Sequence, residues 1–383
     1  MPSFMPVALI VSVLLAPAAL GDLLPMTYAS VLNTSALTAR PPASPQGLGP
    51  YRVGRSTFAY VDTTRENRLM VMDAWYPVTQ DDAAGVEPSS YDLVFAGLES
   101  PVALANPVIA DDEPFPLLVF SHGSLGIRFQ SFFLTEALAS HGFIVVAVDH
   151  AGNTAQDLVF DTLEPFELNA VNRPQDVSFT ITTMLGRNAA ANDPFFGRID
   201  AQRIGVLGHS FGGYTALATA SGIDGVAADT RVIALAPFAP ASSILTDAQL
   251  QSITVPTLIL GGTADITTPV DNQSSRPFEL LSSPERTRID LIDAGHQSFT
   301  NICILSETLL DAGIDMDLVA FLLGNAAEGC APDLMPIETA HDLSIVYIVS
   351  FMKTFVTGDP RYAKYLTPAF TASKQLPATV YVP

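Results

Sequence analysis

Short apolar runs bounded by polar and glycine-rich turns recur through the middle of the chain. Continuous apolar runs of this length indicate strands buried on both faces, and alternating or β-branched patterns indicate half-buried strands. The continuous runs are residues 117–120, 143–148, 203–207, 231–236 and 256–260. The alternating or β-branched segments are residues 51–61, 68–76 and 287–292. We therefore predict that each of these segments forms a strand.

Segments of helix-forming residues separate most of the predicted strands. The predicted helices are residues 129–140, 174–185, 214–220, 271–281 and 337–356. Gly142 suits the C-terminal cap of the first helix, and Pro174 suits the first turn of the second. Strands alternating with helices predict an α/β fold, with a mostly parallel central sheet and helices on both faces.

Two segments lack these patterns and are predicted to be connections. Residues 77–116 carry many Pro, Asp and Gly residues and a weak helical patch, so we expect a long surface connection there. A polar loop is expected from His150 to Asn172. No internal repeat and no second domain boundary is evident, so residues 51–383 are predicted to form one domain.

Length, hydrophobic content and net charge limit the possible domain organisation and the possible binding partners. The chain has 383 residues, of which 48% are hydrophobic, enough for one large α/β domain or two smaller ones. Its formal net charge of -21 argues against nucleic acid and anionic membrane surfaces as partners, because both would repel it. The charge identifies no partner and leaves the oligomeric state open.

The N-terminal region has the pattern of an export signal. An apolar run at residues 4–20 contains Pro6 and Pro17 and ends in small-residue cleavage patterns. We predict a signal peptide at 1–21, followed by an N-terminal arm at 22–50 that is rich in Pro, Ala, Thr and Ser. No Lys or Arg precedes the run, so a transmembrane anchor and a misassigned start codon remain alternatives. The short, proline-containing run favours a secreted or periplasmic protein without a stable membrane span.

The two cysteines of the chain lie in one segment. Cys303 and Cys330 fall within residues 300–335, which we interpret as an insertion. An exported chain can form a disulfide between them, and two inert buried thiols are the alternative. The cysteines lack metal-site spacing and partner ligands, so no metal and no cofactor is expected.

One motif carries the chemistry of the chain. Residues 208–212, Gly-His-Ser-Phe-Gly, match the G-x-S-x-G pattern between a predicted strand and a predicted helix. Small flanking residues let the backbone turn sharply and expose the Ser210 hydroxyl. The same turn places the Phe211 backbone N–H at a helix N-terminus, where it can bind an oxyanion. The strand-turn-helix context favours a nucleophilic serine over a merely structural glycine-rich turn.

A base and an orienting acid follow along the chain. Ser210, Asp265 and His296 occur in the order Ser, Asp, His, and each comes just after a predicted strand. Because parallel strands bring their C-terminal ends to one edge of the sheet, the three side chains can converge there. Nearby carboxylates fit less well, since they lie at a helix start, inside a strand and in the turn before the histidine. These are Asp271, Asp290 and Asp293.

The remaining histidines are assigned to other roles. His141 is predicted to end a helix, where a cation suits the helix dipole, and His341 falls inside the C-terminal helix. His122 and His150 sit at strand ends and are candidates for lining the pocket. His209 precedes the nucleophile and is a further pocket candidate, with buried support of Ser210 as its expected role.

The second oxyanion donor is expected in the loop after the strand at 117–120. His122, Gly123 and Ser124 form this loop, and we select the Ser124 backbone N–H as the partner of the Phe211 N–H. The alternative for Gly123 is simply a tight exit from the strand.

Several motifs together resemble one branch of the α/β-hydrolases. They are Phe-Ser-His-Gly at 120–123, the segment 139–150, Arg-Pro-Gln-Asp-Val at 173–177, the nucleophile motif at 208–213 and Asp-Ala-Gly-His at 293–296. Over roughly residues 50–300 the chain is similar to the platelet-activating-factor acetylhydrolase and dienelactone-hydrolase-like branch. That resemblance implies a Ser-His-Asp hydrolase of esters without a metal. True dienelactone hydrolases use a cysteine nucleophile, whereas position 210 is a serine. The insertion at 300–335 lies outside the family pattern and is expected to affect the site, because it follows His296 directly.

The sequence therefore predicts an exported serine esterase, lipase-like or acetylhydrolase-like, acting on a small-molecule or lipid-like carboxylic ester. A polyester or amide hydrolase with the same triad is one alternative. A non-catalytic binding protein with a hydrolase fold is the other, although such a protein usually lacks part of the triad, which is complete here.

Overall fold

The computed structural model describes residues 43–93, 96–314 and 326–383, all within one structural unit, Pro41–Pro383. The predicted signal peptide at 1–21 and most of the predicted arm at 22–50 lie outside the described residues.

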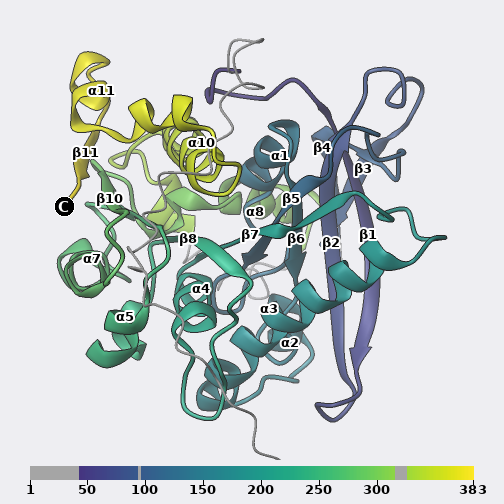
Figure 1. The fold of residues 1–383 in the computed structure, drawn as a ribbon, viewed down its shortest axis with the longest axis horizontal. Helices are drawn as coiled ribbons and strands as arrows, with labels where there is room; N and C mark the ends of the chain where they lie inside the picture. The colour runs from purple at the N-terminus through teal and green to yellow at the C-terminus, as the bar shows by residue number, and fades with distance from the viewer. Residues whose placement is uncertain (1–42, 94–95, 315–325) are drawn as a thin grey trace, which may run out of the picture. The chain divides into compact units, whose positions relative to one another are not determined.

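A single mixed sheet forms the centre of the described structure (Figure 1). Its spatial order is β11-β10-β9-β8-β7-β5-β6-β2-β1-β4-β3, and the run from β10 to β6 is parallel. The strands are β1 (Arg52–Asp62), β2 (Arg68–Val78), β3 (Pro88–Asp92), β4 (Gly97–Ala105), β5 (Phe115–Ser121), β6 (Ile144–Val148), β7 (Ile199–His209), β8 (Val232–Phe238), β9 (Thr257–Gly262), β10 (Arg286–Leu291) and β11 (Ala378–Tyr381). The mostly parallel sheet that the sequence predicts is confirmed.

Helices cover both faces of the sheet, and each face has its own apolar core between the sheet and the helices. Residues of α1, α8 and α10 pack on one face, and residues of α3, α4 and α5 pack on the other. The α-helices are α1 (Phe132–Ser140), α2 (Ala155–Val159), α3 (Phe166–Ala189), α4 (Phe211–Ser221), α5 (Asp247–Ser252), α6 (Val270–Gln273), α7 (Ser275–Leu280), α8 (Ile302–Asp311), α10 (Ile337–Phe355) and α11 (Pro368–Ser373). Short 3₁₀ helices are η2 (Ser242–Ile244), η3 (His296–Phe299) and η4 (Pro360–Leu366).

The expectation of a surface connection at residues 77–116 is wrong, because β3 and β4 extend the sheet beyond β1. β3 alternates exposed and buried residues, but its buried Ser89 is polar, which hides the pattern in the sequence. The Arg55 guanidinium donates a hydrogen bond to the Ser89 hydroxyl and so satisfies it. Pro88 is tolerated because it begins a strand at the sheet edge.

The helix expected to begin near Pro174 begins earlier, and the polar loop before it is interrupted. α3 starts at Phe166, so Pro174 lies in its interior, and the short helix α2 precedes it. Proline has no backbone N–H. The Ala170 carbonyl would normally accept from the N–H of residue 174, so Pro174 leaves this carbonyl without its helical donor. The Tyr214 hydroxyl donates to this carbonyl at 3.0 Å, so a neighbouring helix replaces the missing bond.

Candidate active site

Ser210 occupies a sharp turn between β7 and α4, as the motif predicts. Its φ of 57° and ψ of -116° are unusual for a residue other than glycine. A Cβ at Gly212 would lie 1.9 Å from the Ser121 carbonyl oxygen, and one at Gly208 would lie 2.4 Å from the Gly212 oxygen. Only glycines allow the turn to approach β5 this closely, and the turn leaves Ser210 partly exposed.

The structure brings Ser210, His296 and Asp265 into one hydrogen-bond chain. His296 Nε2 lies 2.9 Å from Ser210 Oγ, and His296 Nδ1 lies 2.8 Å from Asp265 Oδ2. The acid follows β9 and the histidine follows β10, so both come from neighbouring strand ends. A carboxylate can only accept, so Nδ1 of a neutral ring carries the proton and Nε2 is free to accept from the serine.

The environment of Asp265 keeps its carboxylate charged. Burial raises its pKa, but hydrogen bonds from His296 and Thr268 outweigh burial and hold the pKa below the ordinary value of 3.8. The Thr268 backbone N–H donates to Oδ1 at 2.6 Å, and its hydroxyl donates to Oδ2 at 2.7 Å. Thr268 is therefore a second fixed partner of the acid, which the sequence analysis missed.

The competing carboxylates lie where they were expected, away from His296 Nδ1. Asp290 is within β10 and pairs with Arg288 at 2.6 Å. Asp293 is exposed with a φ of 62°, and Asp271 lies in the first turn of α6.

The loop after β5 lies beside Ser210 and includes a backbone donor without a described partner. A Cβ at Gly123 would lie 3.5 Å from Ser210 Cβ, so the two backbones are adjacent. The Gly123 N–H already donates to Gln130 Oε1 at 3.0 Å. The Ser124 N–H has no hydrogen-bond partner among the described residues. Phe211 is the first residue of α4, so its N–H also lacks a helical acceptor.

The His122 ring holds the peptide group that carries the Ser124 N–H. Its Nε2 accepts from the His150 backbone N–H at 3.1 Å, so Nδ1 is the nitrogen that donates to the Gly123 carbonyl at 2.7 Å. Burial lowers the pKa of His122 well below 6.5, which keeps the ring neutral. Because a peptide group is planar, holding the Gly123 carbonyl also fixes the direction of the Ser124 N–H.

A chain of hydrogen bonds through Gln130 and His209 links this loop to the backbone of His296. Gln130 Oε1 accepts from Gly123, so Gln130 Nε2 donates to His209 Nδ1 at 2.9 Å. His209 Nε2 then donates to the His296 carbonyl at 2.9 Å. Burial lowers the pKa of His209 to about 3, so the ring is neutral, as these donor and acceptor assignments require.

Three histidines proposed from the sequence as pocket lining lie elsewhere. His122, His150 and His209 have at most 1% of their surface exposed, and their rings are hydrogen-bonded to protein groups. Their polar ring atoms bind protein groups, so they support the site instead of lining an open pocket. For His209 this is the buried support that its position next to Ser210 predicts.

Of the predictions for His141 and His341, the first is wrong in part and the second is confirmed. Burial lowers the pKa of His141 to about 4, so the ring at the end of α1 is neutral and the expected cation there is wrong. His341 lies inside α10 as predicted, and its Nε2 contacts the Thr300 carbonyl at 2.9 Å.

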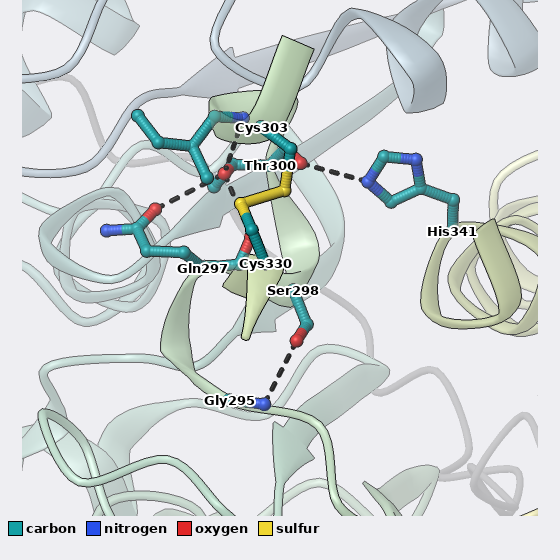
Figure 2. Close-up of a disulfide and its surroundings, with 8 residues drawn as sticks. Gly295, Gln297, Ser298, Thr300, Cys303, Cys330 and His341 are labelled. Atoms are coloured by element: carbon teal, nitrogen blue, oxygen red, sulfur yellow. Dashed lines mark hydrogen bonds between the residues drawn. A yellow bond between two sulfur atoms is a disulfide. The ribbon is translucent and has the colours of Figure 1, made fainter. Parts of the chain in front are cut away.

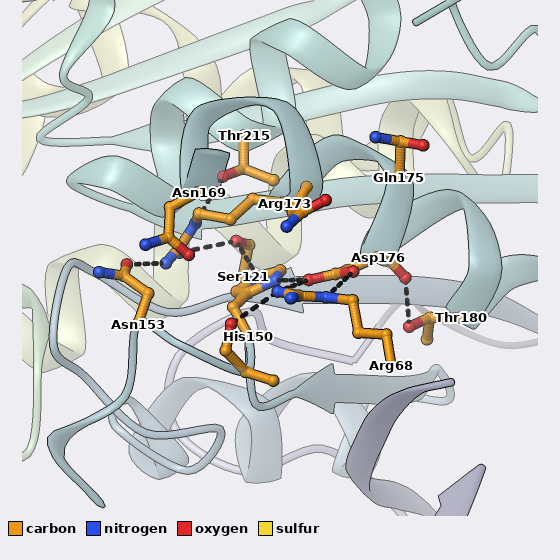
Figure 3. Close-up of polar contacts among 12 residues, drawn as sticks. Arg68, Ser121, His150, Asn153, Asn169, Arg173, Gln175, Asp176, Thr180 and Thr215 are labelled. Atoms are coloured by element: carbon orange, nitrogen blue, oxygen red, sulfur yellow. Dashed lines mark hydrogen bonds and ion pairs between the residues drawn. The ribbon is translucent and has the colours of Figure 1, made fainter. Parts of the chain in front are cut away.

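Arg173 ties the loop to α3 from a fully buried position (Figure 3). Its guanidinium donates to the His122 carbonyl, to Asn153 Oδ1 at 2.6 Å and to Thr215 Oγ1 at 3.1 Å. It also lies 4.6 Å from the centre of the Phe211 ring. Burial lowers the pKa of Arg173 to about 9, so the side chain stays charged at neutral pH.

A second Ser-His-Asp arrangement lies beside Arg173 and is sealed from solvent. Ser121 Oγ is 2.8 Å from His150 Nε2, and His150 Nδ1 is 2.9 Å from Asp176 Oδ2. All three side chains have no exposed surface, so this arrangement is a structural support of the loop. Arg173 and Asp176 belong to the Arg-Pro-Gln-Asp-Val motif, which marked them in the sequence without indicating their role.

The described part of residues 300–335, the segment predicted to be an insertion, contacts the residues around His296. Cys303 and Cys330 form a disulfide, as predicted (Figure 2). A Cβ at Gly295 would lie 2.2 Å from the Glu328 carbonyl oxygen, so the segment before Cys330 packs directly on the residue before His296. The Thr267 hydroxyl also donates to the Glu328 carboxylate at 2.8 Å, next to the acid loop.

No group of three or more His, Cys, Asp or Glu side chains in the described part of the chain is placed to hold a metal ion. No helix in that part is both long and apolar enough to cross a membrane.

Comparisons with known proteins place the fold. A family model described as PET hydrolase-like matches residues 118–308. Cutinase est1 from Thermobifida alba is 28% identical over 261 residues, covering 67% of this chain and 66% of the relative. Bis(hydroxyethyl) terephthalate hydrolase from Streptomyces coelicolor is 25% identical over 264 residues, covering 68% of this chain and 64% of the relative. The chain thus spans about two thirds of the length of these curated relatives.

A solved structure extends the likeness over more of the chain. The ferulic acid esterase from Streptomyces cinnamoneus aligns with a TM-score of 0.64 and 22% sequence identity, covering 87% of this chain and 97% of that one. The chain therefore has the α/β-hydrolase fold that the motifs predict.

Proposed function

We propose that this protein is a serine hydrolase of carboxylic esters that works through an acyl-enzyme. The observation that carries the proposal is the hydrogen-bond chain from Ser210 through His296 to Asp265, at 2.9 and 2.8 Å. Two free backbone N–H groups lie beside it, at Ser124 and Phe211. The relatives named above are themselves hydrolases of esters by name.

Each group then has one task in the reaction. Ser210 Oγ attacks the acyl carbon while His296 Nε2 takes the hydroxyl proton, and Asp265 stabilises the charged ring. The Ser124 and Phe211 N–H groups hold the negative oxygen of the tetrahedral intermediate. His296 returns the proton to the departing alcohol, which leaves the acyl group on Ser210. Water activated by His296 then releases the acid and restores the serine.

The names of the relatives favour polyester-like substrates as a second candidate. They are cutinases and a hydrolase of bis(hydroxyethyl) terephthalate, and the matching family is described as PET hydrolase-like. The likeness to platelet-activating-factor acetylhydrolases rests on the sequence motifs alone, so a small acetyl ester remains the narrower proposal. Amide hydrolysis with the same groups is the remaining alternative.

We also propose that the protein is exported. A disulfide is typical of proteins that fold in an oxidising compartment, and Cys303–Cys330 is one. The predicted signal peptide at 1–21 points the same way.

Replacing the nucleophile tests the proposal. We expect Ser210→Ala to lower kcat on p-nitrophenyl butyrate by roughly 10⁴- to 10⁶-fold, because the hydroxyl is the attacking group. Ser221→Ala, at the other end of α4, is the matched control and should keep wild-type activity. A folded Ser210→Ala protein that kept more than a few per cent of the activity would show that Ser210 is not the nucleophile. Bis(hydroxyethyl) terephthalate, a polyester film and an anilide, assayed in parallel, rank the substrate classes.

A further inference from the structure

Five large apolar side chains are exposed from the last two residues of α2, through the connection that follows, to the first residue of α3. Their exposed fractions are 38% for Leu158, 38% for Val159, 55% for Phe160, 43% for Leu163 and 52% for Phe166. We name this set the apolar shelf. α2 has no buried residue at all, so this short helix contributes nothing to the core. Single exposed apolar residues are ordinary, but a sequence-local cluster of this kind marks a binding surface.

The helix α2, which carries the first shelf residues, begins next to the turn of the first proposed oxyanion donor. The Ala155 N–H, at the start of α2, donates to the Gly126 carbonyl at 3.0 Å. Gly126 and Thr154 also form an isolated parallel bridge. Gly126 belongs to the same turn as Ser124, and its own N–H bonds to the Gly123 carbonyl. The turn that carries Ser124 and the start of α2 are thus joined by backbone hydrogen bonds, three residues before Leu158.

The shelf ends on the second proposed donor. The Phe166 ring stacks on the Phe211 ring, with centroids 5.0 Å apart and planes 14° from parallel. Phe211 is the residue after the nucleophile and is only 3% exposed, so the half-exposed Phe166 covers it. The shelf therefore contacts the proposed oxyanion hole through Phe166, and its other end lies on the helix whose start is bonded to the turn of Ser124.

The connection that carries the shelf is firmly held although its side chains face solvent. Thr154 and Asp157 form a reciprocal capping box at the start of α2. The Glu164 N–H donates to the Gly152 carbonyl at 2.8 Å, and the Arg68 guanidinium holds the Glu164 carboxylate at 3.1 Å. A surface fixed in this way binds an apolar group without first having to become ordered.

We propose that the apolar shelf binds the apolar portion of the ester substrate, which extends from the scissile carbonyl held at Ser124 and Phe211. This inference rests on the proposed function and narrows its substrate class to esters with a long apolar chain. The shelf is continuous with the proposed reaction centre, because Phe166 stacks on Phe211 and the start of α2 is bonded to the turn that carries Ser124. The substrate is accordingly an ester with a long apolar chain on its acyl or its alcohol side, so an acetyl ester fits this proposal only if its alcohol is long.

A pair of double variants tests the shelf. Phe160→Ser/Leu163→Ser removes two exposed shelf side chains and leaves Phe166, which covers Phe211, in place. Leu48→Ser/Val108→Ser is the matched control, because these residues are 55% and 67% exposed. They lie beside the end of α1 and the end of β2, remote from the strand ends that carry the site.

The readout is chain-length selectivity in kcat/KM. The substrates are ethyl acetate, ethyl decanoate and decyl acetate, so that a long chain is placed on either side of the ester. We expect the shelf variant to keep wild-type kcat/KM on ethyl acetate and to lose about tenfold on at least one long ester, since roughly one apolar side chain of contact is removed. The control variant should match wild type on all three.

The outcomes separate the two proposals. If wild type hydrolyses these esters and the shelf variant keeps the wild-type ratio of long to short substrates, the shelf proposal is overturned and the proposed function stands. If wild type hydrolyses no ester, the proposed function itself fails. A dimer that forms in wild type and dissociates in the shelf variant, with the substrate ratio unchanged, would instead assign the shelf to a second copy of the chain.

Discussion

Asp265 determines which nitrogen of His296 carries the ring proton. Its replacement by asparagine would place an amide N–H against Nδ1, which favours the tautomer with a proton on Nε2, where Ser210 needs an acceptor. We expect Asp265→Asn to lower kcat by roughly 10⁴-fold at neutral pH with the fold intact. Kinetics and circular dichroism on the same sample check both halves.

Asp293→Asn is the matched control for that substitution. Asp293 is exposed, and its φ of 62° is one that asparagine readily adopts, so activity and stability should not change. An Asp265→Asn protein within tenfold of wild type would remove Asp265 from the proposed triad.

Gln130 is expected to act on the reaction through its neighbours, as a positioning residue. Gln130 accepts a hydrogen bond from the Gly123 N–H and donates one to His209, which in turn donates to the His296 carbonyl. It therefore fixes the position of the loop at residues 122–124 relative to the backbone of His296. We expect Gln130→Ala to lower kcat by about 10- to 100-fold with little change in KM, because a small displacement of an oxyanion donor weakens binding of the transition state.

Gln175→Ala provides the comparison for Gln130. Gln175 lies on α3, and among the described residues its side chain bonds only to the Val171 carbonyl of its own helix, so its loss should leave both kinetic constants unchanged. A rise in KM at constant kcat in Gln130→Ala would contradict the positioning role and indicate a substrate contact.

The three residues of the hydrogen-bond chain could be found in the sequence because each follows a buried strand. Ser210, Asp265 and His296 were selected by that rule, and the structure brings them together. Gln130 and Arg173 could not be found in this way. Their roles depend on hydrogen bonds to residues far along the chain, and no local pattern records such pairings.

At the scale of elements, the disulfide holds the insertion against the histidine loop. Cys303 is in α8. Cys330 comes two residues after Glu328, which contacts both Gly295 and Thr267. Closing a loop with a sequence separation of 27 stabilises by about 3.5 kcal/mol in the chain-entropy model, which ignores strain. We expect reduction, or Cys303→Ser/Cys330→Ser, to lower the melting temperature and also to lower kcat. Calorimetry and an ester assay with and without reductant measure the two effects.

The kinetic half of that prediction can fail independently. A reduced protein with a lower melting temperature but unchanged kcat at 25 °C would show that the insertion stabilises the fold without ordering the site. Alkylation under denaturing conditions counts the thiols and verifies that the bond was broken.

The sequence predicts strands well where both faces are buried by apolar residues. It predicts elements poorly where their position depends on polar contacts with distant residues. The continuous apolar runs became β5 to β9, because strands buried on both faces leave an unmistakable pattern. β3 was missed because its buried Ser89 depends on Arg55 for a partner. The start of α3 was misplaced because Pro174 is accommodated by Tyr214 of another helix, which no local rule anticipates.

At the scale of the whole molecule, one buried carboxyl joins the added sheet edge to the core. Glu136 of α1 is 2% exposed and accepts hydrogen bonds from the Tyr91 hydroxyl of β3 at 2.6 Å and the Ser100 hydroxyl of β4 at 2.5 Å. Trp75 of β2 in turn donates to the Tyr91 oxygen at 2.9 Å. Burial raises the pKa of Glu136 from 4.5 to about 7, because the charged form is poorly solvated there.

This raised pKa predicts how the stability of the molecule depends on pH. Between about pH 4.5 and 7 the folded protein keeps the Glu136 proton while the unfolded chain has lost it, so the free energy of unfolding falls as the pH rises through this window. The loss amounts to roughly 3 kcal/mol by pH 7 and levels off within about one pH unit above it. Glu136→Gln keeps an oxygen that can accept from Tyr91 and Ser100 but cannot ionise, so its stability should lack this decline. Glu113→Gln, which removes the same charge from an exposed loop, should decline in parallel with wild type. Urea unfolding at pH 5, 6, 7 and 8 measures the three curves, and a Glu136→Gln curve parallel to wild type would show that Glu136 is already ionised in the folded protein at pH 5.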